Sequence, residues 1–166
     1  VTVDVTPSVV VSLVSATPDH DIVSMEMGPS FSPVGTVLAV SRDSSLLAIQ
    51  HRLEGIESNV VSLLDIKGVD RHIDLAVPVY PILGLNAMDF SPDGTLLAAG
   101  GLEQTVFVWD TRDERLVAEL PFGDAIVDVK FSGDGRALVV SSAGEHAHVT
   151  IWSVESWVAD QELSSA

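Results

Sequence analysis

Short apolar runs, separated by turn-forming residues, recur along most of the chain. Between Leu85 and Leu120, the segment "AMDF" alternates between apolar and polar residues, "LLAA" is continuously apolar, and "TVFVW" alternates again. Alternation predicts a strand with one buried face, and a short continuous apolar run predicts a strand that is covered on both faces. The more polar "RLVAEL" that follows suits an exposed edge strand. The pattern therefore predicts a sheet of four short strands.

A tight turn separates the first two predicted strands, at Ser91-Pro92-Asp93-Gly94. Proline presets its own φ, an aspartate side chain accepts hydrogen bonds from nearby backbone amides, and glycine adopts the left-handed conformation without strain. These residue types in this order predict a hairpin that joins the first strand to the second.

The same unit recurs further along the chain, where Phe131 matches Phe90, Asp134-Gly135 matches Asp93-Gly94, and Trp152 falls opposite Trp109 after a short insertion. A degraded earlier copy reads "GTVLAVSRDSSLLAIQ" and is followed by "NVVSLLDI". Its hairpin could lie in "FSPVG" or in "SRDSS". We prefer the second frame because it leaves complete third and fourth strands in "NVVSLLDI" and "HIDLAV". A repeat of this length with four strands is typical of a propeller blade.

The unit resembles a blade of the WD-repeat β-propeller family: "FSPDG" joins the first two strands, small apolar residues fill the second, and Trp109-Asp110 closes the third. The resemblance implies an all-β fold of four-stranded antiparallel blades, in a partial or oligomer-completed ring. Some family features are replaced: no Gly-His pair precedes the first strand, Ala99 stands where a small hydroxyl is usual, and Glu103 lies near the position usually held by Asp. We therefore expect an incomplete Asp-His-Ser-Trp tetrad, with Trp109 held mainly by apolar packing.

We interpret the chain as one propeller segment. Propellers close with about four to eight blades, and each blade buries its faces only against its neighbours. We therefore expect the ring to be completed by the remaining blades of a longer chain or by self-assembly with a second copy. The expected units are a partial blade at 1–34, a degenerate blade at 35–77, and blades at 83–120 and 124–163.

The charge balance narrows the range of partners. The formal net charge is −16, with only 8 lysines and arginines in total, whereas nucleic acids and anionic membranes are bound through clustered basic residues. We expect neither as a partner. The apolar runs fall short of the roughly 18 residues that span a bilayer, and the absence of cysteine excludes disulfides and thiolate metal sites. These features predict a soluble, cytoplasmic protein.

Motifs for catalysis are sparse. The chain contains neither a phosphate-binding G-x-x-x-x-G-K-[ST] loop nor a G-x-S-x-G elbow, so we expect no cofactor and no enzymatic activity. His146 and His148 have a spacing that a metal can use, but two ligands without an adjacent Cys or acidic cluster favour a polar loop. His51 is predicted to be isolated, and Asp74 to lie in a solvated turn.

The expected function is a non-catalytic scaffold that binds a protein partner through loops on one face of the ring. Aromatic and arginine side chains are the usual interface anchors, although Tyr80 and Phe122 could instead cap the ends of the blade core. The alternatives are a hydrolase of the lactonase-like propeller class and a purely architectural segment of a larger regulatory protein. The candidate partner-binding residues are Arg52, Tyr80, Glu103, Phe122 and Asp124.

Overall fold

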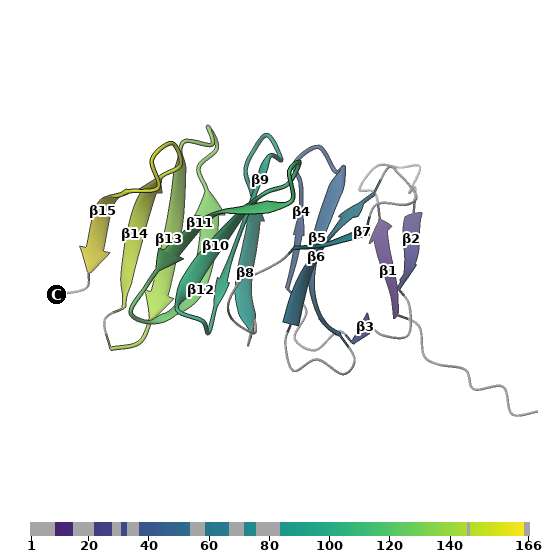
Figure 1. Cartoon of the computed structure of the whole chain (residues 1–166), viewed down its shortest axis with the longest axis horizontal. Helices are drawn as coiled ribbons and strands as arrows, with labels where there is room; N and C mark the ends of the chain where they lie inside the picture. Colours follow the sequence, from purple (N-terminus) through teal and green to yellow (C-terminus); the bar gives the residue numbers. More distant parts are fainter. Residues whose placement is uncertain are drawn as a thin grey trace, which may run out of the picture.

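Every regular element that the computed structural model describes is a β-strand (Figure 1). The described residues are 9–14, 22–27, 31–32, 37–53, 59–66, 72–75, 84–145 and 147–164. The strands are β1 (Val9–Val14), β2 (Ile22–Met27), β3 (Phe31–Ser32), β4 (Leu38–Val40), β5 (Leu46–Leu53), β6 (Asn59–Asp65), β7 (His72–Leu75), β8 (Leu85–Phe90), β9 (Leu96–Gly101), β10 (Thr105–Asp110), β11 (Arg115–Pro121), β12 (Ala125–Phe131), β13 (Ala137–Ala143), β14 (His148–Ser153) and β15 (Ala159–Ser164).

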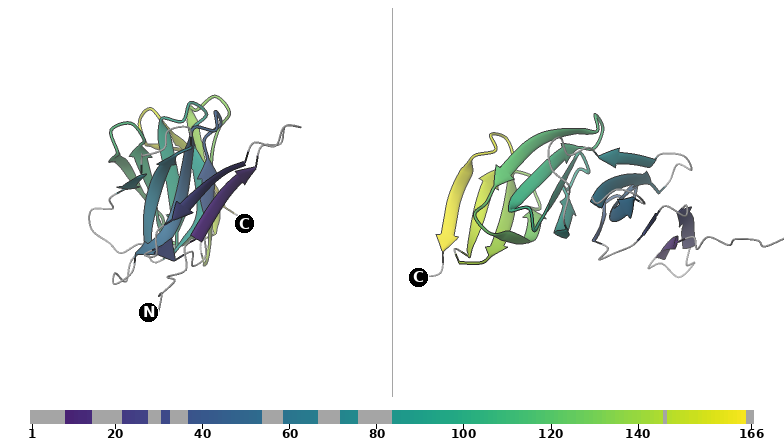
Figure 2. Two further views of the ribbon diagram at one scale, coloured as in Figure 1. Left: turned by 90° about the vertical axis from the view of Figure 1, so that its right-hand side faces the viewer. Right: turned by 60° about the horizontal axis from the view of Figure 1, so that its bottom comes forward.

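These strands form a two-stranded ribbon, β1–β2, and three larger antiparallel sheets. In the proximal sheet, β5, β6 and β7 follow in order, and the short β3 and β4 both pair with β5. The middle sheet is β8–β11 and the distal sheet is β12–β15, each with its strands in sequence order. The sheets stand side by side along the long axis of the molecule, and a turned view shows that the row is curved (Figures 1 and 2).

The strands predicted from the apolar pattern are confirmed in the middle and distal sheets. The hairpin frame at Ser41 is also confirmed. The Ser41 N–H donates to the Leu46 carbonyl oxygen at 2.9 Å, and the turn joins the antiparallel strands β4 and β5. The expectation that the candidate residue Arg52 belongs to a loop is wrong. Strand β5 continues to Leu53, because Arg52 pairs with β3 on one side and with β6 on the other.

A serine and an aspartate close the first hairpin of each larger sheet. In the middle sheet, the Ser91 hydroxyl donates to Asp93 Oδ1 at 2.6 Å and accepts from the Leu96 N–H at 2.9 Å. Asp93 Oδ1 also accepts from the Thr95 N–H at 3.1 Å, and Gly94 has a φ of 72°. The hydroxyl therefore links the aspartate to the start of the second strand. Ser41 and Ser132 have the same donor and acceptor pattern, in the pairs Ser41–Asp43, Ser41–Leu46, Ser132–Asp134 and Ser132–Ala137.

The core lies between the sheets. Small and aliphatic side chains of the proximal sheet, such as Ala48 and Leu63, pack against Leu97, Phe107 and Trp109 of the middle sheet. Trp109 is fully buried, and its ring lies 5.9 Å from that of Phe107. A second cluster fills the joint between the middle and distal sheets. Each sheet therefore buries its neighbour's apolar face.

The joint between the middle and distal sheets is close at one point. A Cβ atom added to Gly100 would lie 2.8 Å from Cγ2 of Ile126, which is itself fully buried. Beside this contact, the Asn86 side-chain amide donates to the Ile126 carbonyl oxygen at 2.8 Å. The separation of the two sheets therefore depends on the absence of a side chain at residue 100.

Replacing Ser91 with alanine is expected to destabilise the fold by about 1–2 kcal/mol, because the part-buried Leu96 N–H loses the hydroxyl of the buried Ser91 as its acceptor. Urea unfolding measures the change. Ser132→Ala removes the same bonds from a more exposed turn and should cost less. An equal or larger loss at Ser132 would contradict the role of burial in this argument.

Acid should weaken the fold through these turns. The Ser91 hydroxyl bond, followed by the Thr95 N–H bond, lowers the pKa of Asp93 below its ordinary value of 3.8. A carboxyl whose folded pKa is lowered contributes stability that is present above the unfolded pKa and is lost as the pH falls through the folded pKa. Asp93→Asn should therefore flatten the decline in unfolding midpoint below about pH 4. Glu155→Gln, an exposed carboxylate outside these turns, is the control, and an equal flattening there would contradict the prediction.

Candidate protein-binding surface

One end of the middle and distal sheets gathers three connecting segments. The turn at 102–104 joins β9 to β10, the connection at 122–124 joins β11 to β12, and the segment at 144–147 joins β13 to β14. Because successive antiparallel strands reverse direction, these segments share one end of the sheets, and the serine-aspartate hairpins lie at the other. We call this end the loop face.

Glu103 ties the turn at 102–104 to the start of the middle sheet. Its Oε1 accepts from the Gly84 N–H at 3.0 Å, and the Leu102 N–H donates to the Gly84 carbonyl oxygen at 2.9 Å. A Cβ atom added to Gly101 would lie 2.0 Å from that same carbonyl oxygen. Glycine at 101 therefore lets the backbone approach closely, and this part of the loop face has a fixed shape.

Asp124 has a related position in the distal sheet. A Cβ atom added to Gly144 would lie 2.0 Å from Asp124 Oδ1, so the carboxylate sits directly against this glycine. In the middle sheet the carboxylate comes from the turn, at Glu103, and meets a glycine of the connection, at Gly84. In the distal sheet the carboxylate instead comes from the connection, at Asp124, and the glycine comes from the segment between β13 and β14, at Gly144. Both loops of the face are held by a carboxylate that lies against glycine backbone.

Phe122 lies in the connection between the two sheets and is half-buried. Its N–H donates to the Gln104 carbonyl oxygen at 2.7 Å, its ring stacks on His148 with centroids 5.5 Å apart, and its centroid is 5.9 Å from that of Trp152. Phe122 therefore packs over the joint, as the capping alternative expects, while remaining partly exposed at the loop face.

Three of the five sequence-predicted residues, Glu103, Phe122 and Asp124, belong to the loop face. The Arg52 backbone lies in β5, and its side chain is outside the described part of the structure, as is the whole of Tyr80. Sequence reasoning did not single out Leu102, whose exposed fraction is 55%. The available signal was an aliphatic residue between a glycine and a glutamate in a predicted turn.

The prediction that His51 is isolated is wrong. Its Nε2 lies 2.6 Å from the Ser62 hydroxyl oxygen, and that hydroxyl donates to Asp74 Oδ1 at 2.5 Å. Asp74 is part of β7, within the predicted strand "HIDLAV", rather than of a solvated turn. The three residues meet because they lie on one face of three adjacent strands. His51 and Ser62 are almost completely buried, with exposed fractions of 1% and 0%.

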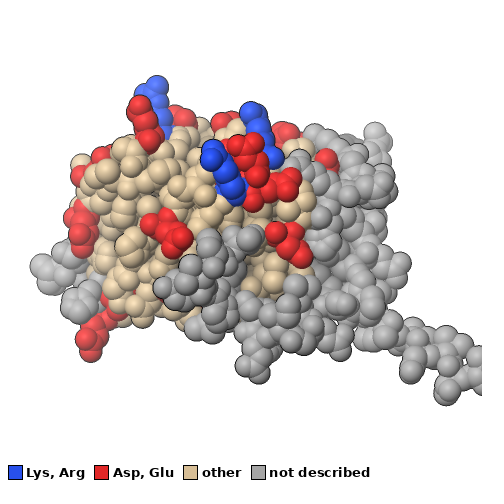
Figure 3. Space-filling model, viewed as in Figure 1, with Lys and Arg blue, Asp and Glu red and all other residues tan. Residues whose placement is uncertain are grey.

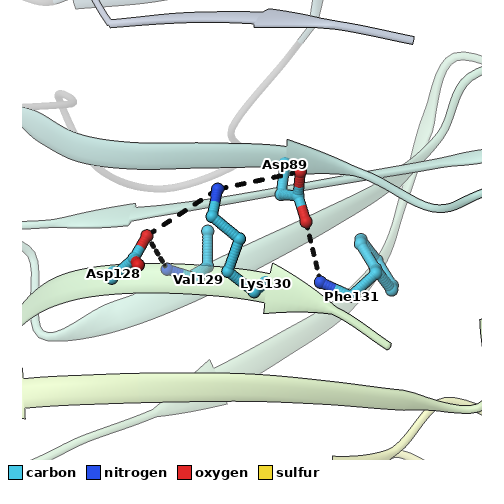
Figure 4. Close-up of polar contacts among 5 residues, drawn as sticks. All are labelled: Asp89, Asp128, Val129, Lys130 and Phe131. Atoms are coloured by element: carbon cyan, nitrogen blue, oxygen red, sulfur yellow. Dashed lines mark hydrogen bonds and ion pairs between the residues drawn. The ribbon is translucent and has the colours of Figure 1, made fainter. Parts of the chain in front are cut away.

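The first strands of the middle and distal sheets, β8 and β12, carry a small charged network (Figure 4). Asp89 Oδ2 accepts from the Phe131 N–H at 2.8 Å, across the joint between the sheets. Lys130 Nζ lies 3.8 Å from Asp89 Oδ1 and 3.9 Å from Asp128 Oδ1. The positive charge of Lys130 thus partly neutralises the negative charges of both carboxylates. Within the described ranges, His, Asp and Glu side chains form no group of three or more that could hold a metal ion.

Four-stranded antiparallel sheets that pack face to face in a curved row define the chain as a β-propeller type of protein. The solved structure of Kuenenia stuttgartiensis hydrazine synthase is similar in fold, with a TM-score of 0.64 and 20% sequence identity over 80% of this chain and 36% of that one. The family model described as "WD domain, G-beta repeat" matches residues 82–110. This match identifies residues 82–110 as similar to a WD repeat.

Several curated proteins resemble parts of the chain. It is 33% identical over 79 residues to the small ribosomal subunit protein RACK1y of Oryza sativa subsp. japonica, covering 48% of this chain and 23% of that protein. It is 33% identical over 63 residues to eukaryotic translation initiation factor 3 subunit I of Phaeosphaeria nodorum, covering 38% and 19%. It is 37% identical over 82 residues to the Drosophila melanogaster LST8 homolog, covering 49% and 25%. The chain thus matches at most a quarter of these relatives' lengths.

Helices of the length and apolarity needed to cross a membrane do not occur among the residues that the structure describes.

Replacing Glu103 with alanine is expected to loosen the loop face, because the Gly84 N–H loses its acceptor at a cost of about 1–2 kcal/mol. Hydrogen exchange at the Gly84 amide, together with urea unfolding, measures both effects. Glu103→Gln is the matched control, since its amide oxygen can still accept the bond. If the alanine and glutamine variants exchange Gly84 at the same rate, the bond does not hold the loop.

Proposed function

We propose that this chain is a non-catalytic protein–protein interaction scaffold of the WD-repeat type, which binds a protein partner through the loop face. The convergence of Glu103, Phe122 and Asp124 beside the exposed Leu102 supports this proposal most directly. The first three side chains are held by backbone contacts or ring stacking. A surface that is rigid before binding loses less conformational entropy when a partner docks.

The names of two relatives support a role within assemblies. RACK1y is named as a protein of the small ribosomal subunit, and the Phaeosphaeria protein as a subunit of a translation initiation factor. Because the chain matches only part of each relative, we carry over the general role of a component in a protein complex and none of their particular partners.

The charge of the surface favours a protein partner with basic and apolar groups. The formal net charge is −16, and the few basic side chains visible on one face lie against acidic ones (Figure 3). Such a surface repels phosphate, so neither nucleic acid nor an anionic membrane belongs to the proposed function. At the loop face, the acidic residues Glu103 and Asp124 lie at the same end of the sheets as the apolar residues Leu102 and Phe122. The cysteine-free sequence is compatible with action in the reducing cytoplasm.

The polar clusters favour a scaffold over a lactonase-like hydrolase. In the cluster of His51, Ser62 and Asp74, the hydroxyl lies between the imidazole and the carboxylate, and both the hydroxyl and the imidazole are buried. A serine nucleophile instead needs a base that is oriented by the acid, and access to substrate. The carboxylates of Asp89 and Asp128, on β8 and β12, are ion-paired with Lys130 at the joint between the sheets.

Recovery of a partner protein on the immobilised chain tests the proposal. Leu102→Ser removes an exposed apolar group, and Phe122→Ala and Tyr80→Ala remove aromatic groups. Loss of a true anchor should lower recovery about tenfold or more. Arg112→Ala, in an exposed turn at the opposite end of the middle sheet, is the control and should leave recovery unchanged.

Phe122→Ala also removes packing over the joint, so its thermal unfolding midpoint must be compared with that of the unaltered chain. Leu102→Ser is free of this complication because Leu102 is mostly exposed. Unchanged recovery with both Leu102→Ser and Phe122→Ala would reject the loop face as the binding surface and favour the architectural alternative.

A further inference from the structure

Strand β12 is the first strand of the distal sheet, and its hydrogen-bonded neighbour among the described strands is β13. In an antiparallel pair, successive residues turn their backbone N–H and C=O groups alternately toward the neighbouring strand and away from it. The N–H groups of Val129 and Phe131, two residues apart, both donate to carboxylates rather than to β13. They therefore lie on the edge of β12 that is opposite β13, which we call the β12 edge.

Two carboxylates occupy these N–H groups (Figure 4). The Phe131 N–H donates to Asp89 Oδ2 at 2.8 Å. The Val129 N–H donates to Asp128 Oδ1 at 2.9 Å. In a sheet, the partner of such an N–H is the carbonyl oxygen of the next strand. Each carboxylate oxygen thus takes the place that the carbonyl oxygen of an added strand would take.

A third backbone group of the β12 edge is also occupied. The register shift between Ile126 and Asp128 adds one residue to the strand, so Ile126 faces the same edge as Val129. The Ile126 carbonyl oxygen accepts from the Asn86 side-chain amide at 2.8 Å. A bulge also bends the strand, and bulges together with charged side chains are the features by which natural proteins keep exposed sheet edges from pairing.

The β12 edge can be reached from solvent. The side chains of Lys130 and Asp128 are 58% and 54% exposed, and the exposed fraction of Val127 is 49%. Lys130 Nζ lies 3.8 Å from Asp89 Oδ1 and 3.9 Å from Asp128 Oδ1, which limits the repulsion between the two carboxylates. An exposed row of backbone groups is otherwise a template for a strand of another chain.

The bond from Asp89 is particular to one joint. Asp89 stands two residues before the hairpin serine of its sheet, and the corresponding residues of the proximal and distal sheets are Ala39 and Lys130. An alanine side chain has no acceptor, so β4 cannot offer β8 the bond that β8 offers β12. The carboxylate therefore meets a requirement of the β12 edge rather than of every unit.

We propose that Asn86, Asp89 and Asp128 close the β12 edge to strand addition, because they occupy the backbone groups through which β12 of a second copy of the chain would pair. The second copy is the occupant because its β12 edge carries the same row of groups, and two identical antiparallel edges can pair about a two-fold axis. The β12 edge is thus a latent interaction surface that is blocked from within. The proposal does not depend on binding at the loop face.

Replacing both carboxylates, in Asp89→Ala/Asp128→Ala, should open the β12 edge. In dilute solution the Val129 and Phe131 amides should exchange with solvent about tenfold faster than in the unaltered chain, because each loses a charged acceptor. Sedimentation over a concentration series, in about 0.5 M sodium chloride to screen the net charge, should then show self-association that protects both amides. A double variant that associates no more than the unaltered chain would overturn the proposal.

Two matched variants separate the occupied N–H groups from the effect of charge. In Asp89→Asn/Asp128→Asn the amide oxygens can still accept both bonds, so this variant should associate no more than the unaltered chain. Asp113→Ala/Glu155→Ala removes two negative charges from exposed turns and should behave in the same way. If either variant associates as strongly as Asp89→Ala/Asp128→Ala, charge repulsion alone keeps the copies apart and the proposal is overturned.

Asp89→Ala also removes a bond between the sheets, so a variant that leaves this bond in place is needed. Asp128→Ala alone should accelerate amide exchange at Val129 and leave the rate at Phe131 unchanged. If the double variant associates while both amides exchange as fast as in dilute solution, the contact lies on another surface and the proposal is overturned.

Discussion

Burial of one sheet's aliphatic face beneath the large side chains of the next sheet is the interaction on which the rest of this structure depends. A single sheet of four strands has two broad faces and cannot bury both by itself. Here the aliphatic face of one sheet is covered by leucine and aromatic side chains of its neighbour. The packing of one sheet on the next therefore supplies most of the stability, whereas the last face of the distal sheet leaves Leu163 58% exposed.

Polar contacts set the geometry within which this burial works. Asn86 and Asp89 bond to backbone groups of β12, and the close approach of Gly100 to Ile126 fixes the separation of the sheets. The serine-aspartate hairpins act within a single sheet, where they fix the start of the second strand. Directional bonds thus determine register and spacing, while apolar contact supplies most of the driving force.

The loop face is a consequence of the same construction. Its turns at 102–104 and 144–147 are short because each connects two adjacent strands of one sheet, and backbone contacts at Gly84 and Gln104 hold the face. Phe122 belongs to both parts of the molecule, since it packs over the joint and remains partly exposed at the loop face. The proposed binding surface therefore inherits its shape from the packing of the sheets.

The sequence by itself determined the strands, the hairpins and the class of fold, because each follows from contacts between near neighbours. Alternation of side chains has a period of two, and Ser91-Pro92-Asp93-Gly94 contains every group that its turn requires. Even the degraded copy at Ser41 was placed in the right frame.

Only the tertiary structure decided which distant residues meet. Arg52 is held in a strand by two partner strands, His51 reaches Ser62 and Asp74 across three strands, and Asp124 lies against Gly144. None of these contacts has a local signal, because each depends on the register between strands and on how far apart the sheets stand. Those quantities are fixed by the packing of whole faces rather than by the order of residues within one segment.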